Sequence, residues 1–154
     1  MEQLIVLCGE NNTGKTITLR MLAALLYPCG PIIQPIQKTK TVVDIWAKIV
    51  SDMDSSKGAG DFRTIIELSG KKIGIYSYGD TEKLICEGVK FFQDNACDIG
   101  VMPCHPKKSH FEILVSEYGS IMTVFPKRKV VSNERYFENI SMATQLYQTV
   151  IKYI

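Results

Sequence analysis

Eight consecutive residues at positions 9–16, Gly-Glu-Asn-Asn-Thr-Gly-Lys-Thr, have the types and the spacing of a loop that binds phosphate. The two glycines, Gly9 and Gly14, let the backbone turn sharply and approach an anion closely. Backbone N–H groups in such a bend point inward and form a nest for a phosphate. A helix that starts near Lys15 would add the positive end of its dipole. The pattern therefore predicts a site for a phosphorylated ligand.

The two side chains that end the motif have separate predicted tasks. Lys15 has the charge and the length to reach the β- and γ-phosphates of a nucleotide, and we expect it to take part in catalysis. Thr16 can offer its hydroxyl to Mg²⁺. In the bend between the two glycines, the backbone matters more than the side chains. The residues predicted to contact the nucleotide are Gly9, Glu10, Asn11, Asn12, Thr13, Gly14, Lys15, Thr16 and Ile17.

Regular elements on both sides of the motif must position it. Residues 3–8 (QLIVLC) form a short apolar run, which predicts a strand buried on both faces. After the loop, Pro28 and Gly30 end a predicted helix. Its apolar residues recur at helical spacing and are Leu19, Leu22, Ala23 and Leu26. The order of strand, glycine loop and helix is the context that the motif requires.

In this context, the first 27 residues resemble the opening of the P-loop NTPase superfamily, and the rest of the chain is compatible with it. The resemblance implies an α/β fold in which the phosphate loop follows the first strand of a sheet. It also implies that Lys15 and Thr16 bind ATP or GTP together with Mg²⁺. We assign no subfamily.

The remaining apolar runs predict further strands and helices along the chain. Strands are expected at residues 62–68, 72–78, 98–102 and 120–125, and helices at 41–53, 81–95 and 133–154. Loops are expected at 28–40, 54–61 and 103–110, and residues 111–117 form either a short helix or an irregular stretch.

The short connection between the strands at 62–68 and 72–78 sets the predicted topology. Only Ser69, Gly70 and Lys71 separate them, so they form an antiparallel hairpin. If strand 72–78 lies parallel to strand 3–8, we expect an α/β fold of three layers with a mainly parallel sheet. Its spatial order would be 2-3-1-4-5 with strand 2 antiparallel, an arrangement similar to that of small GTPases. Residues 1–154 would form a single P-loop nucleotide-binding domain.

Asp80 is the candidate for a second metal ligand. A P-loop NTPase needs an acid at the carboxyl end of a strand beside the strand that leads into the loop, to hold Mg²⁺. Asp80 follows the predicted strand at 72–78, where the chain passes from a strand to a helix. We therefore expect Asp80 to bind the metal and to act in catalysis. The alternative is that Asp80 only caps the following helix, since aspartate is a favoured cap.

The choice of nucleotide is made by elimination. GTPases read guanine with Asn-Lys-x-Asp after a later strand, and this chain has no such tetrad. The Asp-x-x-Gly element is also absent, because Asp80 is followed by Thr81, Glu82 and Lys83. We therefore expect ATP and Mg²⁺ as the bound cofactors.

Two basic clusters follow the later strands, at Lys107 with Lys108 and at Lys127, Arg128 and Lys129. On the rim predicted to hold the phosphate loop, they could bind the nucleotide, an anionic acceptor or a nucleic-acid backbone. The alternative is a solvated charged surface. Arg128 is the best-placed candidate to stabilise the charge of a transition state, as an arginine finger would.

Composition is typical of one soluble globular domain. Of 154 residues, 45% are apolar and 22% charged, and the formal net charge is +2. No apolar stretch approaches the roughly 20 residues that span a bilayer, and we see no secretory leader. The five cysteines show neither paired spacing nor a zinc pattern with the histidines, which indicates reduced thiols. We expect a cytoplasmic protein without a membrane partner.

Three functions are compatible with these residues. The first is Mg²⁺-dependent hydrolysis of ATP, with Lys15, Thr16 and Asp80 around the phosphates and the metal. The second is transfer of the γ-phosphate to a small anionic acceptor, such as a nucleotide. The third is a switch that binds nucleotide and engages a protein partner without appreciable turnover on its own.

Overall fold

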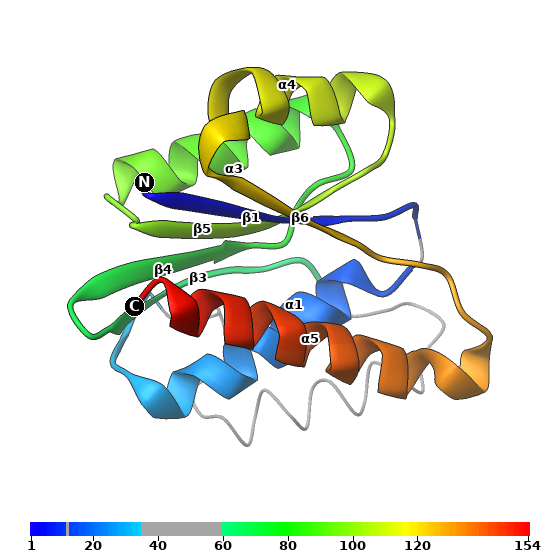
Figure 1. Cartoon of the computed structure of the whole chain (residues 1–154), viewed down its shortest axis with the longest axis horizontal. Helices are drawn as coiled ribbons and strands as arrows, with labels where there is room; N and C mark the ends of the chain where they lie inside the picture. Colours follow the sequence, from blue (N-terminus) through cyan, green and yellow to red (C-terminus); the bar gives the residue numbers. More distant parts are fainter. Residues whose placement is uncertain (12, 35–59) are drawn as a thin grey trace.

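The computed structural model of the chain describes residues 1–11, 13–34 and 60–154. Asn12, the helix predicted at 41–53 and most of the loop predicted at 54–61 lie outside these residues. The described part is an α/β fold of three layers, with one sheet between two pairs of helices (Figure 1). The strands are β1 (Gln3–Cys8), β2 (Ile32–Gln34), β3 (Arg63–Leu68), β4 (Lys71–Tyr76), β5 (Ile99–Cys104) and β6 (Met122–Pro126). The α-helices are α1 (Lys15–Leu26), α3 (Glu82–Asp94), α4 (Lys108–Tyr118) and α5 (Arg135–Lys152).

The sheet has the order β2-β3-β4-β5-β1-β6. Strands β4, β5, β1 and β6 are parallel, and β3 pairs antiparallel with β4, as the short turn between them predicts. The five predicted strands are β1, β3, β4, β5 and β6, so the predicted order 2-3-1-4-5 corresponds to β3-β4-β1-β5-β6. This order is wrong at one place, because β5 lies between β4 and β1. Strands β1 and β5 are both buried and would be interior in either order, so the burial of each strand does not decide which of them lies beside β4. The partly exposed β6 lies at the edge of the sheet in both orders.

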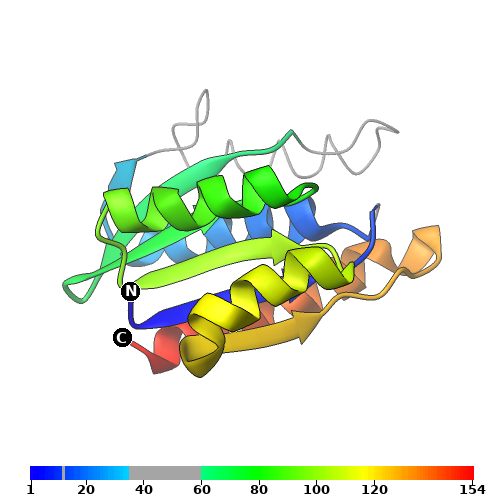
Figure 2. The ribbon, with the colours of Figure 1, turned by 90° about the horizontal axis from the view of Figure 1, so that it is seen from above.

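The helices cover the two faces of the sheet in pairs, α1 with α5 and α3 with α4 (Figure 2). Strand β1 is buried on both faces, since Ile5 and Leu7 pack on the side of α1 and α5. Leu4 and Val6, at the alternate positions, pack on the side of α3 and α4. This alternation explains why the sequence of β1 is an unbroken apolar run.

Three segments differ from the sequence prediction or decide between its alternatives. The short edge strand β2 lies in a segment predicted to be loop, where it pairs with the free edge of β3. Residues 103–110 are not one loop, because β5 continues to Cys104 and α4 begins at Lys108. Of the two alternatives for residues 111–117, the helical one is correct, and the predicted closing helix is α5.

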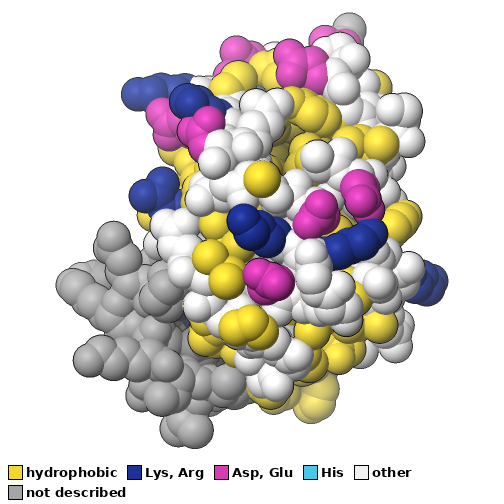
Figure 3. Space-filling view, turned by 90° about the vertical axis from the view of Figure 1, so that its left-hand side faces the viewer, with side chains coloured by type: hydrophobic (Ala, Val, Ile, Leu, Met, Phe, Trp, Pro, Cys, Tyr) yellow, Lys and Arg dark blue, Asp and Glu magenta, His cyan; other side chains and the backbone are white. Residues whose placement is uncertain are grey.

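The end of the molecule from which the parallel strands start carries charges of both signs. Figure 3 shows Lys, Arg, Asp and Glu side chains interspersed on this face. Lys71 forms an ion pair with Glu2 across 2.5 Å, and Lys90 forms one with Asp94 across 2.8 Å. Among the described helices, none combines the length and the apolar character needed to cross a bilayer.

Candidate phosphate-binding site

Loop 9–16 lies at the carboxyl end of β1, where a ligand of an open α/β sheet is expected. The strand ends at Cys8 and α1 begins at Lys15, as predicted. The Gly9 N–H donates to the Cys104 carbonyl oxygen at 3.0 Å, which ties the start of the loop to β5. On the other side, the Lys127 N–H donates to the Cys8 carbonyl oxygen at 2.7 Å and ties it to β6. The loop is therefore held by the strands on both sides of β1.

Each glycine of the loop lies against another element that leaves no room for a side chain. A Cβ atom at Gly9 would lie 2.7 Å from the Lys127 carbonyl oxygen. A Cβ atom at Gly14 would lie 2.5 Å from Oδ1 of Asn139, a residue of α5. Gly14 also has a φ of 83°, which L side chains rarely adopt. Packing thus requires glycine at both positions, and the left-handed backbone also requires it at Gly14.

We predict that Gly14→Ala destabilises the protein more than Gly70→Ala does. Gly70, in the hairpin turn, has a similar φ of 77°, but a Cβ atom there would meet nothing within 4 Å. Both variants carry backbone strain of about 1–2 kcal/mol, and only Gly14→Ala must also displace Asn139. The expected losses in unfolding free energy are about 2–4 kcal/mol for Gly14→Ala and about 1–2 kcal/mol for Gly70→Ala. Urea denaturation measures both, and equal losses would contradict the packing argument.

Lys15 is folded over the loop rather than extended into solvent. Its Nζ donates to the carbonyl oxygens of Gly9 and Glu10, each at 2.6 Å. The residue is only 8% exposed, and this burial lowers the pKa of Lys15 from its ordinary value. The carboxylate of Asp80 gives the largest opposing effect on that pKa, and Asp61 adds a smaller one. The charges of both aspartates therefore favour the protonated form of Lys15.

Hydroxyl groups fix the backbone of the loop from inside. The Thr13 hydroxyl donates to the Glu10 carbonyl oxygen at 2.8 Å, and the Thr18 hydroxyl donates to the Gly14 carbonyl oxygen at 2.8 Å. Asn11 is exposed, and the Ile17 side chain packs against the core on the α1 side. Asn11 can therefore meet a ligand with its side chain, while Ile17 can offer only its backbone.

The expectation that the strand before Asp80 lies beside β1 is wrong, because β5 lies between them, but the charge of Asp80 still acts on Lys15. The chain after β4 passes over the end of β5, because a Cβ atom at Gly79 would lie 2.6 Å from Cγ of Pro103. The alternative that Asp80 only caps α3 is wrong, since the N-cap is Thr81, whose hydroxyl accepts from the Leu84 N–H at 3.2 Å. The exposed Asp80 carboxylate is therefore available for another role.

Asp61 was not predicted, and the structure places it against the loop. The Thr16 hydroxyl donates to Oδ1 of Asp61 at 3.0 Å, and the Ser77 hydroxyl lies 3.2 Å from the same oxygen. Asp61 comes shortly before β3, which runs antiparallel to β4, so it lies at the edge of the sheet where β4 ends. That antiparallel pairing is the signal in the sequence that could have found it. Because residues 54–61 were predicted to form a loop, Asp61 was not considered as a site residue.

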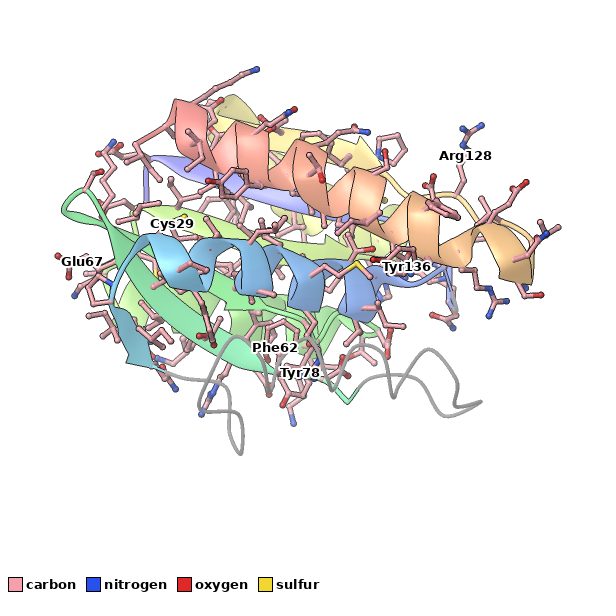
Figure 4. All side chains as sticks on the ribbon, turned by 90° about the horizontal axis from the view of Figure 1, so that it is seen from below. Cys29, Phe62, Glu67, Tyr78, Arg128 and Tyr136 are labelled. Carbon is pink, nitrogen blue, oxygen red and sulfur yellow. The ribbon has the colours of Figure 1, made fainter. Side chains whose placement is uncertain are left out.

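The segment around Asp61 is fastened to α1 and β4. Arg20 of α1 donates to the Gly60 carbonyl oxygen at 2.5 Å, and its guanidinium lies 4.7 Å from the centre of the Phe62 ring. The Tyr78 hydroxyl donates to the Asp61 carbonyl oxygen at 3.4 Å. Phe62 and Tyr78 lie near each other in Figure 4. These contacts hold the Asp61 backbone in place beside Thr16.

Two cysteines meet directly beneath the loop. Cys8 and Cys104 occupy paired positions in β1 and β5. A hydrogen bond with the Cys104 thiol and the charge of Lys15 lower the pKa of Cys8 to about 7, although burial acts in the opposite direction. Burial and the Cys8 thiol raise the pKa of Cys104. Cys8 and Lys15 therefore lie close enough for each to affect the pKa of the other.

The basic residues after β5 and β6 differ in burial. Lys107, Arg128 and Lys129 are exposed, and Arg128 points outward from the ribbon in Figure 4. The Lys127 side chain is fully buried. This residue therefore differs from both interpretations of its cluster, as a solvated surface and as a ligand-binding rim. Among the described residues, no three His, Cys, Asp or Glu side chains gather closely enough to hold a metal ion.

Comparison with known proteins returned no relative for this chain. No protein-family model, no curated protein and no solved structure matches it. The similarity of loop 9–16 to a P-loop therefore stays a prediction, and it is supported by the residues and the geometry of the site itself.

Proposed function

We propose that this protein binds ATP with Mg²⁺ at loop 9–16 and hydrolyses the γ-phosphate. The observation that carries the proposal is the contact between the Thr16 hydroxyl and the Asp61 carboxylate, at 3.0 Å, beside the ammonium of Lys15. A lysine, a hydroxyl and carboxylates beside the glycine turn of a strand and a helix are the groups that phosphoryl transfer uses.

The phosphates would be held by the backbone of the loop and by Lys15. The N-terminus of α1 follows Gly14 directly, so its free N–H groups and its dipole favour an anion there. The Lys15 Nζ already donates to two carbonyl oxygens of the loop, which fixes the position of its charge before a ligand arrives. Such preorganisation reduces the cost of ordering the site when the ligand binds.

The metal would be held by Thr16, Asp80 and the phosphates of the nucleotide. Mg²⁺ keeps several waters and is usually bound through one or two carboxylates together with substrate phosphates. A site of this kind does not need three carboxylates in one place. Asp61 would orient the Thr16 hydroxyl, which is free to turn its oxygen lone pairs toward the metal while it donates to Asp61.

Hydrolysis would proceed by in-line attack of water on the γ-phosphate. In such reactions the protein contributes mainly by positioning the reactants and by stabilising charge. Lys15 and the metal would neutralise the charge that develops on the phosphate oxygens. ATP is preferred over GTP because the chain lacks both guanine-reading and Asp-x-x-Gly motifs.

The exposed residues Lys107 and Arg128, after the two strands that flank β1, favour one alternative function. Positive charge on this rim would attract a small anionic acceptor of the γ-phosphate. The same loop would then serve a phosphotransferase rather than a hydrolase.

The test measures nucleotide binding and phosphate release separately, with ATP and with GTP in Mg²⁺. The proposal expects ATP to bind more tightly than GTP and to release phosphate steadily. Transfer to an added nucleoside monophosphate without free phosphate would support the phosphotransferase. Tight binding with negligible turnover would support a nucleotide-dependent switch, and failure to bind either nucleotide would exclude all three.

A further inference from the structure

The Lys127 side chain is buried beside loop 9–16 without a hydrogen-bond partner. Its residue follows β6, and the exposed fraction of the side chain is 0%. Within the described part of the chain, the buried Lys127 Nζ makes no hydrogen bond. The ammonium has an ion pair with Oε1 of Glu138, on α5, at 3.7 Å. One acceptor at that distance leaves all three N–H groups of the ammonium unsatisfied.

Lys127 and Lys15 approach the same residue of the loop from two sides. The Lys15 Nζ donates to the Gly9 carbonyl oxygen at 2.6 Å. A Cβ atom at Gly9 would lie 3.0 Å from Cβ of Lys127. Burial lowers the pKa of Lys127, Glu138 opposes this, and the charge of Lys15 lowers it further. Two positive charges are thus held near each other at the start of the loop.

The partner of Lys127 also belongs to an element that contacts the loop. Glu138 is followed by Asn139, whose Oδ1 closes the space at Gly14. The same Oδ1 lies 3.4 Å from the Thr18 hydroxyl. The first turns of α5 therefore hold Lys127 at one end of the loop and pack on Gly14 at the other.

A buried ammonium with so few partners is costly to retain if its role is only to pack. Taking such an ion out of water is unfavourable, and an apolar side chain of similar volume is often neutral or better for stability. Charged groups held in unfavourable surroundings are enriched at functional sites. A polyphosphate bound at loop 9–16 would supply negative charge that compensates the positive charges of Lys127 and Lys15.

We propose that Lys127 is a second positive charge of the phosphate site, held by Glu138 and acting through the backbone of loop 9–16 on a bound polyphosphate. Lys127 would be a positioning residue, because its side chain is fully buried and would not contact the ligand. The inference rests on the proposed function and deepens it, since it makes the site selective for ligands with several phosphates. A nucleoside triphosphate should depend on Lys127 more than a diphosphate, and a monophosphate least.

The test compares the affinities of ATP, ADP and AMP in wild type, Lys127→Met, Lys127→Arg and Lys152→Met by calorimetry. Lys127→Met should weaken ATP binding about tenfold or more, ADP binding less and AMP binding least, since the Coulomb energy grows with ligand charge. Lys127→Arg keeps the charge and should recover part of the loss. Lys152 is exposed near the end of α5 and its charge is screened by solvent, so Lys152→Met should change each affinity less than about twofold.

A second variant keeps the test decisive if Lys127→Met folds poorly. Lys127→Met with Glu138→Gln removes both charges, so the half-buried carboxylate of Glu138 is not left without the charge that it faces. It should melt near the wild-type temperature and keep the same order of losses, ATP before ADP before AMP. A folded variant with wild-type affinities, or with equal losses for the three ligands, would show a structural role and overturn the inference.

Failure of the inference can be distinguished from failure of the proposed function. If Lys15→Met loses ATP while Lys127→Met does not, the proposed function stands and the inference is wrong. If wild type binds no ATP, the series is repeated with inorganic tripolyphosphate. Binding that Lys127→Met weakens would then support the inference without the nucleotide, and absence of binding would overturn both.

Discussion

Replacing Lys15 with methionine is expected to lower the affinity for ATP about 100-fold or more. Methionine keeps the apolar stem of the side chain and removes the ammonium. One charge-assisted hydrogen bond to a phosphate oxygen, at about 1.5–3 kcal/mol, and the Coulomb attraction between the ammonium and the other phosphate oxygens together account for a loss of this size. The variant also loses the two hydrogen bonds at 2.6 Å that fold Lys15 over the loop, so the loop should be less ordered before binding.

Calorimetric titration with ATP in Mg²⁺ measures this loss, with Lys71→Met as the matched control. Lys71 lies at the opposite end of the sheet, where it pairs with Glu2. Its substitution removes the same formal charge and should leave the affinity within about twofold, because exposed charges are screened. Wild-type affinity in Lys15→Met would exclude the phosphate site proposed for loop 9–16.

Replacing Asp80 with asparagine is expected to reduce Mg²⁺-dependent phosphate release about 100-fold or more, with a smaller effect on ATP binding in the absence of metal. The change keeps the size of the side chain and removes the negative charge that would hold Mg²⁺ against the γ-phosphate. Asp61→Asn should act about 10- to 100-fold, because Asp61 would act through Thr16. Its carbonyl oxygen can still accept from the Thr16 hydroxyl, so this variant tests the charge rather than the hydrogen bond.

The two aspartate variants are separated by a titration with Mg²⁺ at saturating ATP, in which the metal concentration for half-maximal rate is measured. A ligand of the metal should shift this concentration strongly, and an orienting residue less. Asp94→Asn is the control, since Asp94 pairs with Lys90 on the exposed side of α3. Unchanged phosphate release in both Asp80→Asn and Asp61→Asn would exclude the metal site described above.

Local sequence patterns predicted the central part of the fold. The apolar run of β1 predicted a strand with both faces buried, because alternate residues had to face different helices. Gly14 and the apolar spacing after it predicted the start of α1. The short turn at Ser69 and Gly70 predicted the antiparallel pairing of β3 and β4. Each of these features depends on neighbours along the chain.

The order of the parallel strands could not be obtained in this way. A parallel crossover from β4 to β5 leaves open whether β1 or β5 lies beside β4, since the connection passes over the face of the sheet. Both strands are apolar and buried, so their own sequences do not distinguish the two orders, and only the pairing of β4 with β5 in the structure does. With β5 in this position, the chain just before Asp80 packs on Pro103 of β5.

The sequence by itself determined the glycine loop, Lys15, Thr16 and the strand and helix that hold them, because these features are encoded in contiguous residues. Only the tertiary structure brought Asp61 to Thr16, which lies 45 positions away along the chain, and buried Lys127 between Gly9 and Glu138. It also showed that Thr81, and not Asp80, caps α3. The physical reason is that burial and pairing of charges depend on which elements pack together. The spacing of residues within one segment cannot predict this packing.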